Sequence, residues 1–210
     1  ELFVFALCQS ERSIHAAGMA RRLRPGPADT LEDRVRAFFA NVDFGVGEGS
    51  APALLVGAIP FDRMQADNLF QPGAVVWRKG LQLPAITESA ARPAWVARSI
   101  TDLPRPESYE LMVAKALQRL GSSTDPLIKV VLARALRVEA SAQVDPMAIA
   151  ALLTRDRSAA TFIVDLSPAS GRVGHALVGA TPELLLSRRG TAIRSNPLAG
   201  SARRSADAAA

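Results

Sequence analysis

Two ionisable residues lie in apolar stretches where their side chains could carry out acid–base chemistry. Glu183 lies in GATPELLLSRRG, after Pro182 and before three leucines, and Lys129 lies in LIKVVLAR, where residues 127–128 and 130–133 are all aliphatic. Burial disfavours the charged form of both groups, so it lowers the pKa of a lysine and raises that of a glutamate, by roughly 3–5 units at full burial. A neutral amine can take a proton from water, and a neutral acid can protonate a departing hydroxyl. Together they could replace one hydroxyl group with another.

A plainer interpretation stands beside the catalytic one for each residue. Glu183 can be a solvated residue at the entrance to a strand, and Lys129 can extend its ammonium group from a strand end into water. Strand alternation places Lys129 on the same face as Val131 and opposite Ile128 and Val130. Both faces are therefore apolar, so the lysine could not easily reach water, although an isolated lysine on a strand more often extends its ammonium group into solvent than stays desolvated. The spacing by itself leaves open whether residues 129 and 183 meet.

The elements around Lys129 follow from hydrophobic periodicity. A helix is predicted over residues 106–121, because apolar residues recur at helical spacing over 113–120, and Ser108 is its expected N-cap. A strand is predicted over residues 127–138, and it would carry Lys129. The lysine is thus expected near the start of a strand that follows a helix.

The rest of the chain is predicted to alternate strands and helices. The pattern indicates strands at the N-terminus and over residues 52–62, 161–166, 172–179 and 183–187, and helices over residues 31–44 and 146–153. Strands in succession after a strand–helix unit indicate a mixed sheet with helices packed on it, in the α/β (α+β) class.

Composition and charge exclude several other classes of protein. The chain has 210 residues, of which 49% are hydrophobic and 21% charged, as in ordinary globular proteins. Its net charge of +5 comes from scattered basic residues and only 5% are aromatic, which argues against a nucleic-acid partner. Cys8 is the only cysteine, so a disulfide framework is excluded and a reducing cytoplasm is expected. The apolar start is short and broken by Gln9 and Ser10, so it indicates a strand rather than a signal peptide or membrane span.

Four blocks of the sequence resemble the isochorismate synthases, which belong to the chorismate-utilising enzymes. The blocks are VGAIPFD at 56–62, KVVLAR at 129–134, VGATPELLLSRRG at 178–190 and SNPLAGSARR at 195–204, and they occur in family order. The resemblance implies the chorismate-utilising fold, with two packed, mostly antiparallel sheets and outer helices. Residues 1–103 would form its N-terminal part, and residues 104–210 would form the first part of the chorismate-binding catalytic region.

The resemblance also implies a reaction, that of an isomerase. Chorismate would be converted to isochorismate by Mg²⁺-dependent addition of water at ring carbon 2 and loss of the hydroxyl at carbon 4. Lys129 matches the family's general base and Glu183 its general acid. Gly200 and Ser201 match the block that contacts the substrate. Ala199 would help to shape the same substrate-binding surface. The product would enter siderophore synthesis, through salicylate or dihydroxybenzoate, or menaquinone synthesis.

Two alternatives stay open. Salicylate synthases share the lysine but usually carry threonine where this chain has Ser201, whereas anthranilate synthases carry glutamine where Lys129 stands. The second alternative is a non-catalytic ligand-binding domain or an inactive fragment. The presence of both Lys129 and Glu183 argues against a pure binding domain.

The resemblance implies that the fold is incomplete in these 210 residues. The family's Mg²⁺-ligating glutamates and several substrate-binding residues are expected downstream of Ala210, so no metal ligands are expected within the chain. Glu107 and Glu110 have an ordinary explanation at the start of a helix. The isolated chain is therefore expected to be inactive. A monomer is expected, with chorismate as its partner and neither nucleic acid nor membrane.

Overall fold

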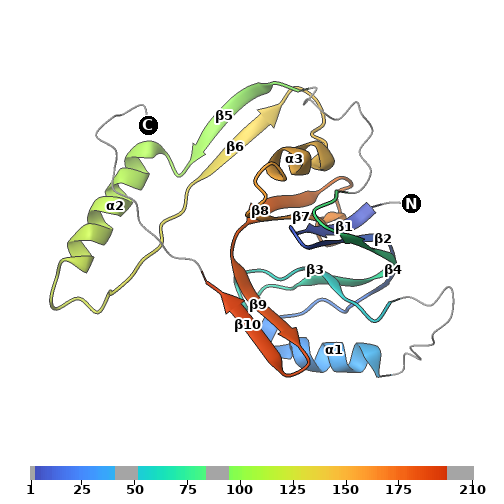
Figure 1. The fold of residues 1–210 in the computed structure, drawn as a ribbon. Helices are drawn as coiled ribbons and strands as arrows, with labels where there is room; N and C mark the ends of the chain where they lie inside the picture. The colour runs from blue at the N-terminus through green and yellow to red at the C-terminus, as the bar shows by residue number, and fades with distance from the viewer. Residues whose placement is uncertain (1–2, 41–51, 84–94, 198–210) are drawn as a thin grey trace. The chain divides into compact units, whose positions relative to one another are not determined.

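The computed structural model describes residues 3–40, 52–83 and 95–197 (Figure 1). The chain divides into two compact units. Unit 1 contains residues 1–91 and 146–210, and unit 2 contains residues 92–145. The boundary between residues 103 and 104 that the resemblance implies separates parts of the family's fold rather than compact units. That boundary stays a prediction.

A six-stranded antiparallel sheet forms the centre of unit 1, in the order β3-β4-β2-β1-β7-β8 (Figure 1). Its strands are β1 (Phe3–Cys8), β2 (Arg12–Arg22), β3 (Val56–Ala58), β4 (Asn68–Lys79), β7 (Ala160–Asp165) and β8 (Ala176–Thr181). The N-terminal strand β1 pairs with β2 on one side and with β7 on the other. Residues from the first and last thirds of the chain therefore form one sheet.

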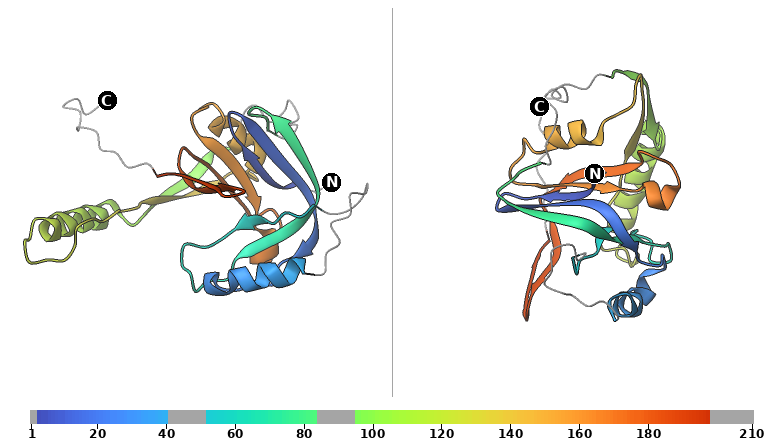
Figure 2. Two further views of the ribbon diagram at one scale, coloured as in Figure 1. Left: turned by 60° about the horizontal axis from the view of Figure 1, so that its bottom comes forward. Right: turned by 90° about the vertical axis from the view of Figure 1, so that its right-hand side faces the viewer.

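The two faces of this sheet are distinguished by strand alternation along β1. Ala6 and Cys8 are fully buried on one face, whereas Phe5 and Leu7 point to the other and line a groove. Helix α3 (Pro146–Leu153) lies alongside β7 and β8 in Figures 1 and 2 and contacts both strands. The predicted helix over residues 146–153 is thus confirmed.

An apolar cluster joins β2, β3 and β4. Its three buried and three half-buried members are Ala16, Val56, Phe70, Phe5, Leu54 and Val75. Gly57 lets β3 approach β4 closely, because its φ is 144° and a Cβ at this position would meet the Asn68 carbonyl oxygen at 1.9 Å. Glycine adopts such a conformation without steric cost, so the VGAIPFD block requires its glycine for strand packing.

Helix α1 (Leu31–Phe39) follows a short 3-10 turn, η1 (Ala28–Thr30). A buried ion pair between Arg34 and Asp67 joins this helix to the rest of unit 1. Arg34 donates to the two oxygens of Asp67 at 3.1 and 2.5 Å. The same guanidinium also donates to three carbonyl oxygens and one hydroxyl, those of Arg24, Gly26, Pro27 and Thr30. All three of its nitrogens therefore have acceptors, as a buried charge requires. The predicted extension of this helix to residue 44 lies outside the described residues.

The last part of unit 1 is a short helix followed by two more strands. Helix α4 (Ser167–Ser170) precedes β8, and β9 (Leu184–Arg189) pairs with β10 (Ala192–Asn196) as a separate antiparallel pair. The three strands predicted between residues 161 and 187 correspond to β7, β8 and β9. β8 begins only at Ala176, because Gly171 and Gly174 adopt positive φ in the turn before it. The strand predicted over 52–62 is reduced to β3.

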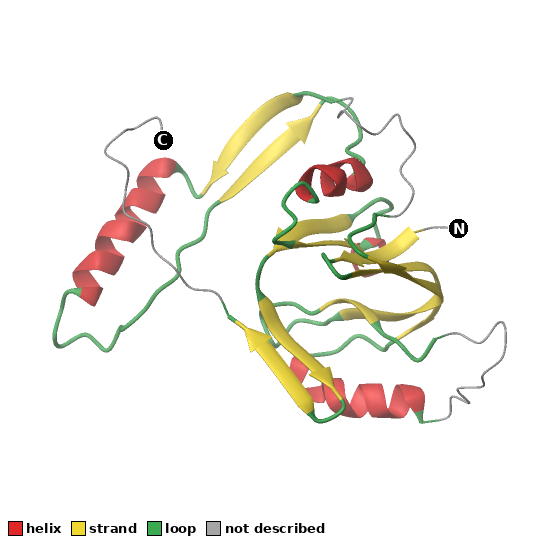
Figure 3. Ribbon diagram, in the orientation of Figure 1, coloured by secondary structure: helices red, strands yellow, loops and turns green. Residues whose placement is uncertain are grey.

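The described residues of unit 2 form one helix and one pair of strands, which are drawn in Figure 3. Strand β5 (Ala97–Leu103) pairs antiparallel with β6 (Ala135–Ala140), and helix α2 (Pro106–Leu120) lies between them in sequence. The predicted helix over 106–121 is confirmed. Its N-cap is Arg105 rather than the predicted Ser108, because Pro106 occupies the first helical position, where its missing N–H costs nothing.

The strand predicted over residues 127–138 is wrong in its first two thirds. β6 begins at Ala135, and residues 127–134 form an irregular segment. In the described part of the chain β6 has one partner, β5, and that pairing ends where Leu103 meets Ala135. The earlier residues have strand propensity but no neighbouring strand to bond with.

Candidate functional site

Glu183 lies in the turn between β8 and β9. Its side chain is exposed, and its backbone N–H donates to the Thr181 hydroxyl at 3.1 Å. Leu185 and Leu186, which follow it, are 87% and 61% exposed. The described residues therefore do not form the dry pocket expected around this carboxylate. In this chain Glu183 is a solvated residue at a strand entrance, and its role as a general acid stays a prediction.

Lys129 lies on the irregular segment between α2 and β6, and its side chain is also exposed. The neighbours that were expected to enclose it are themselves in solvent: Ile128 is 93% exposed and Val131 is 81% exposed. The desolvation expected for Lys129 is therefore not produced by the residues of unit 2. Without a paired strand, the alternation of apolar side chains does not create two covered faces.

The predicted site residues fall into separate parts of the chain. Lys129 belongs to unit 2 and Glu183 to unit 1. Gly200, Ser201 and Ala199 lie outside the described residues. The joint acid–base site therefore stays a prediction that rests on the sequence.

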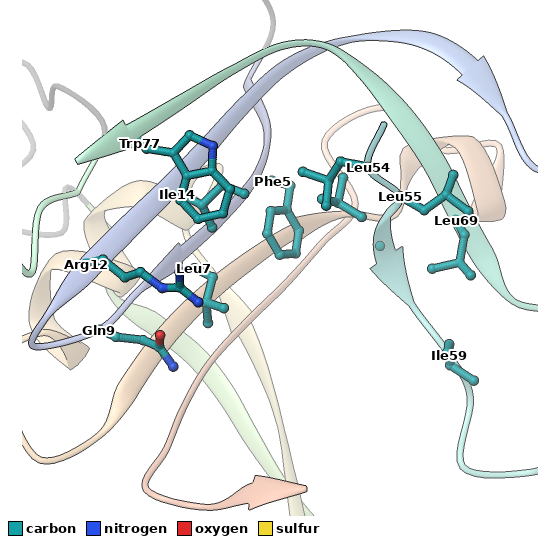
Figure 4. A pocket seen from close by; sticks show the side chains of 12 residues that line it. Phe5, Leu7, Gln9, Arg12, Ile14, Leu54, Leu55, Ile59, Leu69 and Trp77 are labelled. Atoms are coloured by element: carbon teal, nitrogen blue, oxygen red, sulfur yellow. The ribbon is translucent and has the colours of Figure 1, made fainter. Parts of the chain in front are cut away.

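A groove of about 430 Å³ on unit 1 is a feature that the sequence analysis missed (Figure 4). Arg12 and Gln9 are its only polar lining side chains among the described residues, and the Arg12 guanidinium lies 5.4 Å from the centre of the Trp77 ring. The other lining residues are Phe5, Leu7, Ile14, Leu54, Leu55, Val56, Gly57, Ile59, Leu69 and Trp77. The signal that could have found it is the apolar run of β1, in which strand geometry places Phe5 and Leu7 on the same face.

The groove can hold apolar groups but offers no acid–base pair. Its described lining contains no carboxylate, histidine or cysteine, and none of the predicted site residues is part of it. Arg12, the one charged side chain in the described lining, is in cation–π contact with Trp77.

Cys8 belongs to a polar cluster that fixes the chain after β4. Its thiol donates to the Gln82 carbonyl at 3.0 Å, and His15 Nε2 lies 2.7 Å from the same oxygen. The Ser13 hydroxyl donates to the Gly80 carbonyl at 2.8 Å and accepts from the Gln82 N–H at 2.9 Å. Burial raises the pKa of Cys8, and a hydrogen bond with Ser13 opposes part of this effect. A buried thiol with a raised pKa is a poor nucleophile, so the cluster is structural.

Comparison with known proteins assigns the chain to a family. Residues 63–210, which include Lys129 and Glu183, match the chorismate binding enzyme family. The chain therefore belongs to the chorismate-binding enzymes. No helix in the described ranges combines the length and the apolar character needed to cross a membrane.

The chain's sequence relatives within that family are named isochorismate synthases. It is 37% identical over 188 residues to MenF of Mycobacterium tuberculosis, covering 87% of this chain and 49% of MenF. It is 37% identical over 161 residues to DhbC of Bacillus subtilis, covering 76% of this chain and 39% of DhbC. With EntC of Escherichia coli K12 it shares 30% identity over 187 residues, 86% of this chain and 44% of EntC.

The fold is that of a solved isochorismate synthase. The crystal structure of DhbC from Bacillus anthracis, described as specific for 2,3-dihydroxybenzoate, matches with a TM-score of 0.75 and 28% identity. The match covers 99% of this chain and 51% of that one. The resemblance to isochorismate synthases and the mixed α/β fold with a mostly antiparallel sheet are thus confirmed. The chain spans about half the length of the relatives it matches.

Proposed function

We propose that this chain is the part of an isochorismate synthase that carries the general base and the general acid of the reaction. One observation carries the proposal. The relatives named isochorismate synthases match most of the chain, and the family match includes both Lys129 and Glu183. Anthranilate synthases, by contrast, carry glutamine where Lys129 stands.

The proposed reaction converts chorismate to an isomer. Water adds at ring carbon 2, the hydroxyl at carbon 4 leaves, and the ring double bonds shift between the two positions. Lys129 Nζ takes a proton from the attacking water, and the Glu183 carboxyl gives a proton to the departing hydroxyl. One proton is taken up and one is released, so atoms and charges balance.

This chemistry requires Lys129 to be neutral and Glu183 to be protonated before the step. Burial is what would favour these neutral forms, and both side chains are exposed in the described residues. The proposal therefore requires that both side chains become enclosed in the whole enzyme. The relatives are about twice as long as this chain, so they contain additional chain that can supply such a cover.

We further propose that Gly200 and Ser201 contact the substrate, with Ala199 beside them. A glycine permits close approach of the backbone, and a serine hydroxyl can donate a hydrogen bond to a carboxylate. The product would enter a siderophore pathway, through dihydroxybenzoate or salicylate, with menaquinone synthesis as the alternative.

Magnesium is implied by the resemblance rather than by the residues described. Mg²⁺ prefers several oxygen ligands, usually including one or two carboxylates. Across residues 3–40, 52–83 and 95–197 no group of three His, Cys, Asp or Glu side chains is placed to hold a metal ion. These residues do not fit a Mg²⁺ site, and no step of the proposed reaction is assigned to the metal.

The test is product analysis by NMR after incubation with chorismate and Mg²⁺ in the absence of ammonia. The gene product that contains these 210 residues is compared with its Lys129→Gln and Glu183→Gln variants, and the 210-residue chain is assayed beside them. We expect isochorismate from the parent, a loss of at least about 100-fold in each variant, and no product from the chain alone.

Matched controls are Lys115→Gln and Glu110→Gln, which make the same chemical changes on the exposed surface of α2. Both should retain full activity. Isochorismate production that survives Lys129→Gln would rule out the base assignment. Salicylate and pyruvate as the products would assign the chain to the salicylate synthases instead.

A further inference from the structure

The segment that carries Lys129 is bracketed by two ion pairs, both within unit 2. One pair joins Arg119 and Asp125 before the segment, and the other joins Arg134 and Asp102 after it. Lys129 lies four residues beyond Asp125 and five residues before Arg134. Neither pair was indicated by the sequence. Arg134 and Asp102 are distant along the chain, and Arg119 and Asp125 lie on either side of a turn.

The first ion pair fixes the start of the segment to the end of α2. Arg119 donates from Nε and Nη2 to the two carboxylate oxygens of Asp125, at 2.8 and 3.1 Å. The same carboxylate accepts from the Leu127 N–H at 2.9 Å. The hydrogen bonds from Arg119 and then from Leu127 lower the pKa of Asp125. The carboxylate therefore stays ionised and holds the chain two residues before Lys129.

The second ion pair fixes the end of the segment to both β5 and α2. Arg134 donates from Nη2 to Asp102 on β5 at 2.5 Å. Its guanidinium also lies 5.3 Å from the centre of the Tyr109 ring on α2. Arg134 immediately precedes β6, so it closes the segment at the point where regular strand pairing begins.

The residues between these two anchors have no regular structure to order them. Residues 128–133 make no backbone–backbone hydrogen bond to any described residue. Ile128 and Val131 are largely exposed, so packing contributes little order there. The ordering of such a segment depends on its ends, because fixing both ends removes much of the conformational freedom of the residues between them.

We propose that Asp125 and Arg134, with their partners Arg119 and Asp102, are positioning residues for Lys129. The catalytic meaning of this proposal rests on the proposed function, in which Lys129 is the general base. Catalytic groups must be held within about 0.5 Å of their productive geometry. Exposed ion pairs add little to global stability, which leaves local ordering as their main effect.

The lysine content of the chain allows a direct test. It has three lysines, Lys79 on β4, Lys115 on α2 and Lys129. Reductive methylation with ¹³C-formaldehyde labels each with an NMR signal and keeps its charge. The 210-residue chain is compared with its Asp125→Asn and Arg134→Met variants. Matched controls are Glu139→Gln and Arg137→Met, which make the same charge changes at exposed positions of β6.

We expect both anchor variants to narrow the Lys129 signal and to move it toward that of a free peptide, while Lys79 and Lys115 stay unchanged. In the unmethylated chain, tryptic cleavage after Lys129 should rise about fivefold, which corresponds to a loss of about 1 kcal/mol of local ordering. Arg134→Lys should restore part of the ordering, because it keeps the charge but not the planar guanidinium. A Lys129 signal that stays the same as in the two controls would overturn the proposal. Equal movement of all three lysine signals would also overturn it, since that indicates a general loss of structure.

Failure of this inference can be told apart from failure of the proposed function. If Lys129→Gln abolishes isochorismate production and the anchor variants leave the Lys129 signal unchanged, only the positioning role is wrong. In the active enzyme, positioning predicts that Asp125→Asn and Arg134→Met lower kcat while KM changes by less than about twofold. A change in KM alone would contradict it.

Discussion

At the scale of single residues, burial decides which groups are chemically available. Cys8 is fully buried and its thiol donates to the Gln82 carbonyl, so burial raises its pKa. Lys129 and Glu183 are the opposite case, because solvent reaches both. The one cysteine is therefore shielded from solvent. The two proposed catalytic groups would have to be enclosed by further protein before they could act.

We predict that Cys8 resists alkylation in the folded chain. Its thiolate fraction is low and its sulfur is inaccessible, so iodoacetamide should modify it at least about 100-fold more slowly than in urea. The raised pKa has a consequence for stability. The folded chain retains the thiol proton to higher pH than the unfolded chain, so this stabilisation is complete below the ordinary pKa of 9.0 and is lost as pH rises through the folded-state value.

The measurement is the alkylation rate by mass spectrometry, followed by urea unfolding between pH 8 and pH 11. Cys8→Ala is the control, and it should lack the part of the alkaline loss that the thiol causes. Equal alkylation rates in the folded and unfolded chain would contradict the burial of Cys8.

At the scale of elements, one buried ion pair holds α1 to the rest of unit 1. The side chains of Arg34 and Asp67 are only 14% and 1% exposed. Arg36 lies on the same helix but pairs with Glu32 and Asp33 in solvent. Arg34 and Arg36 therefore allow a buried and an exposed ion pair on one helix to be compared.

We predict that Arg34→Met destabilises the chain by about 3–5 kcal/mol, because it leaves the Asp67 carboxylate buried without its partner. Arg36→Met should cost less than about 0.5 kcal/mol, since exposed pairs contribute little. Urea denaturation gives both values, and hydrogen exchange shows whether α1 is released first. Similar losses from the two variants would mean that burial of the pair is not what holds the helix.

At the scale of the whole molecule, both units expose large apolar side chains. Leu185 and Ile193 are exposed in the β9–β10 pair of unit 1, and Ile128 and Val131 are exposed in unit 2. Exposed apolar patches of this kind mark surfaces that normally meet another surface. Their presence agrees with the length comparison, in which the relatives contain about as much chain again.

We predict that the isolated chain binds the dye ANS while it is folded, because ANS reports accessible apolar surface. The double variant Leu185→Lys and Ile193→Lys should lower the fluorescence, because it removes two of the most exposed apolar side chains of unit 1 without touching buried residues. The control, Arg188→Lys on the same strand, should leave the signal unchanged. Fluorescence no higher than that of a compact reference protein would contradict the exposure.

Much of the local structure and the family could be predicted from the sequence. Periodicity located α2, α3, β7 and β9, because helical and strand spacing are local properties of the chain. The four blocks identified the isochorismate synthases, and the comparisons confirm that identification. Lys129 and Glu183 were singled out by their chemical type among apolar neighbours, and their catalytic roles stay predictions.

Only the tertiary structure decided which of these residues are buried. Residues 127–134 have the composition of a strand, but a strand needs a partner, and β5 ends before it can pair with them. For the same reason the apolar neighbours of Lys129 do not enclose it. Asp67 and Arg34 are far apart in sequence, and only folding joins them in a buried pair. Sequence determines propensity and chemical type, whereas burial and pairing depend on which distant segments the fold brings together.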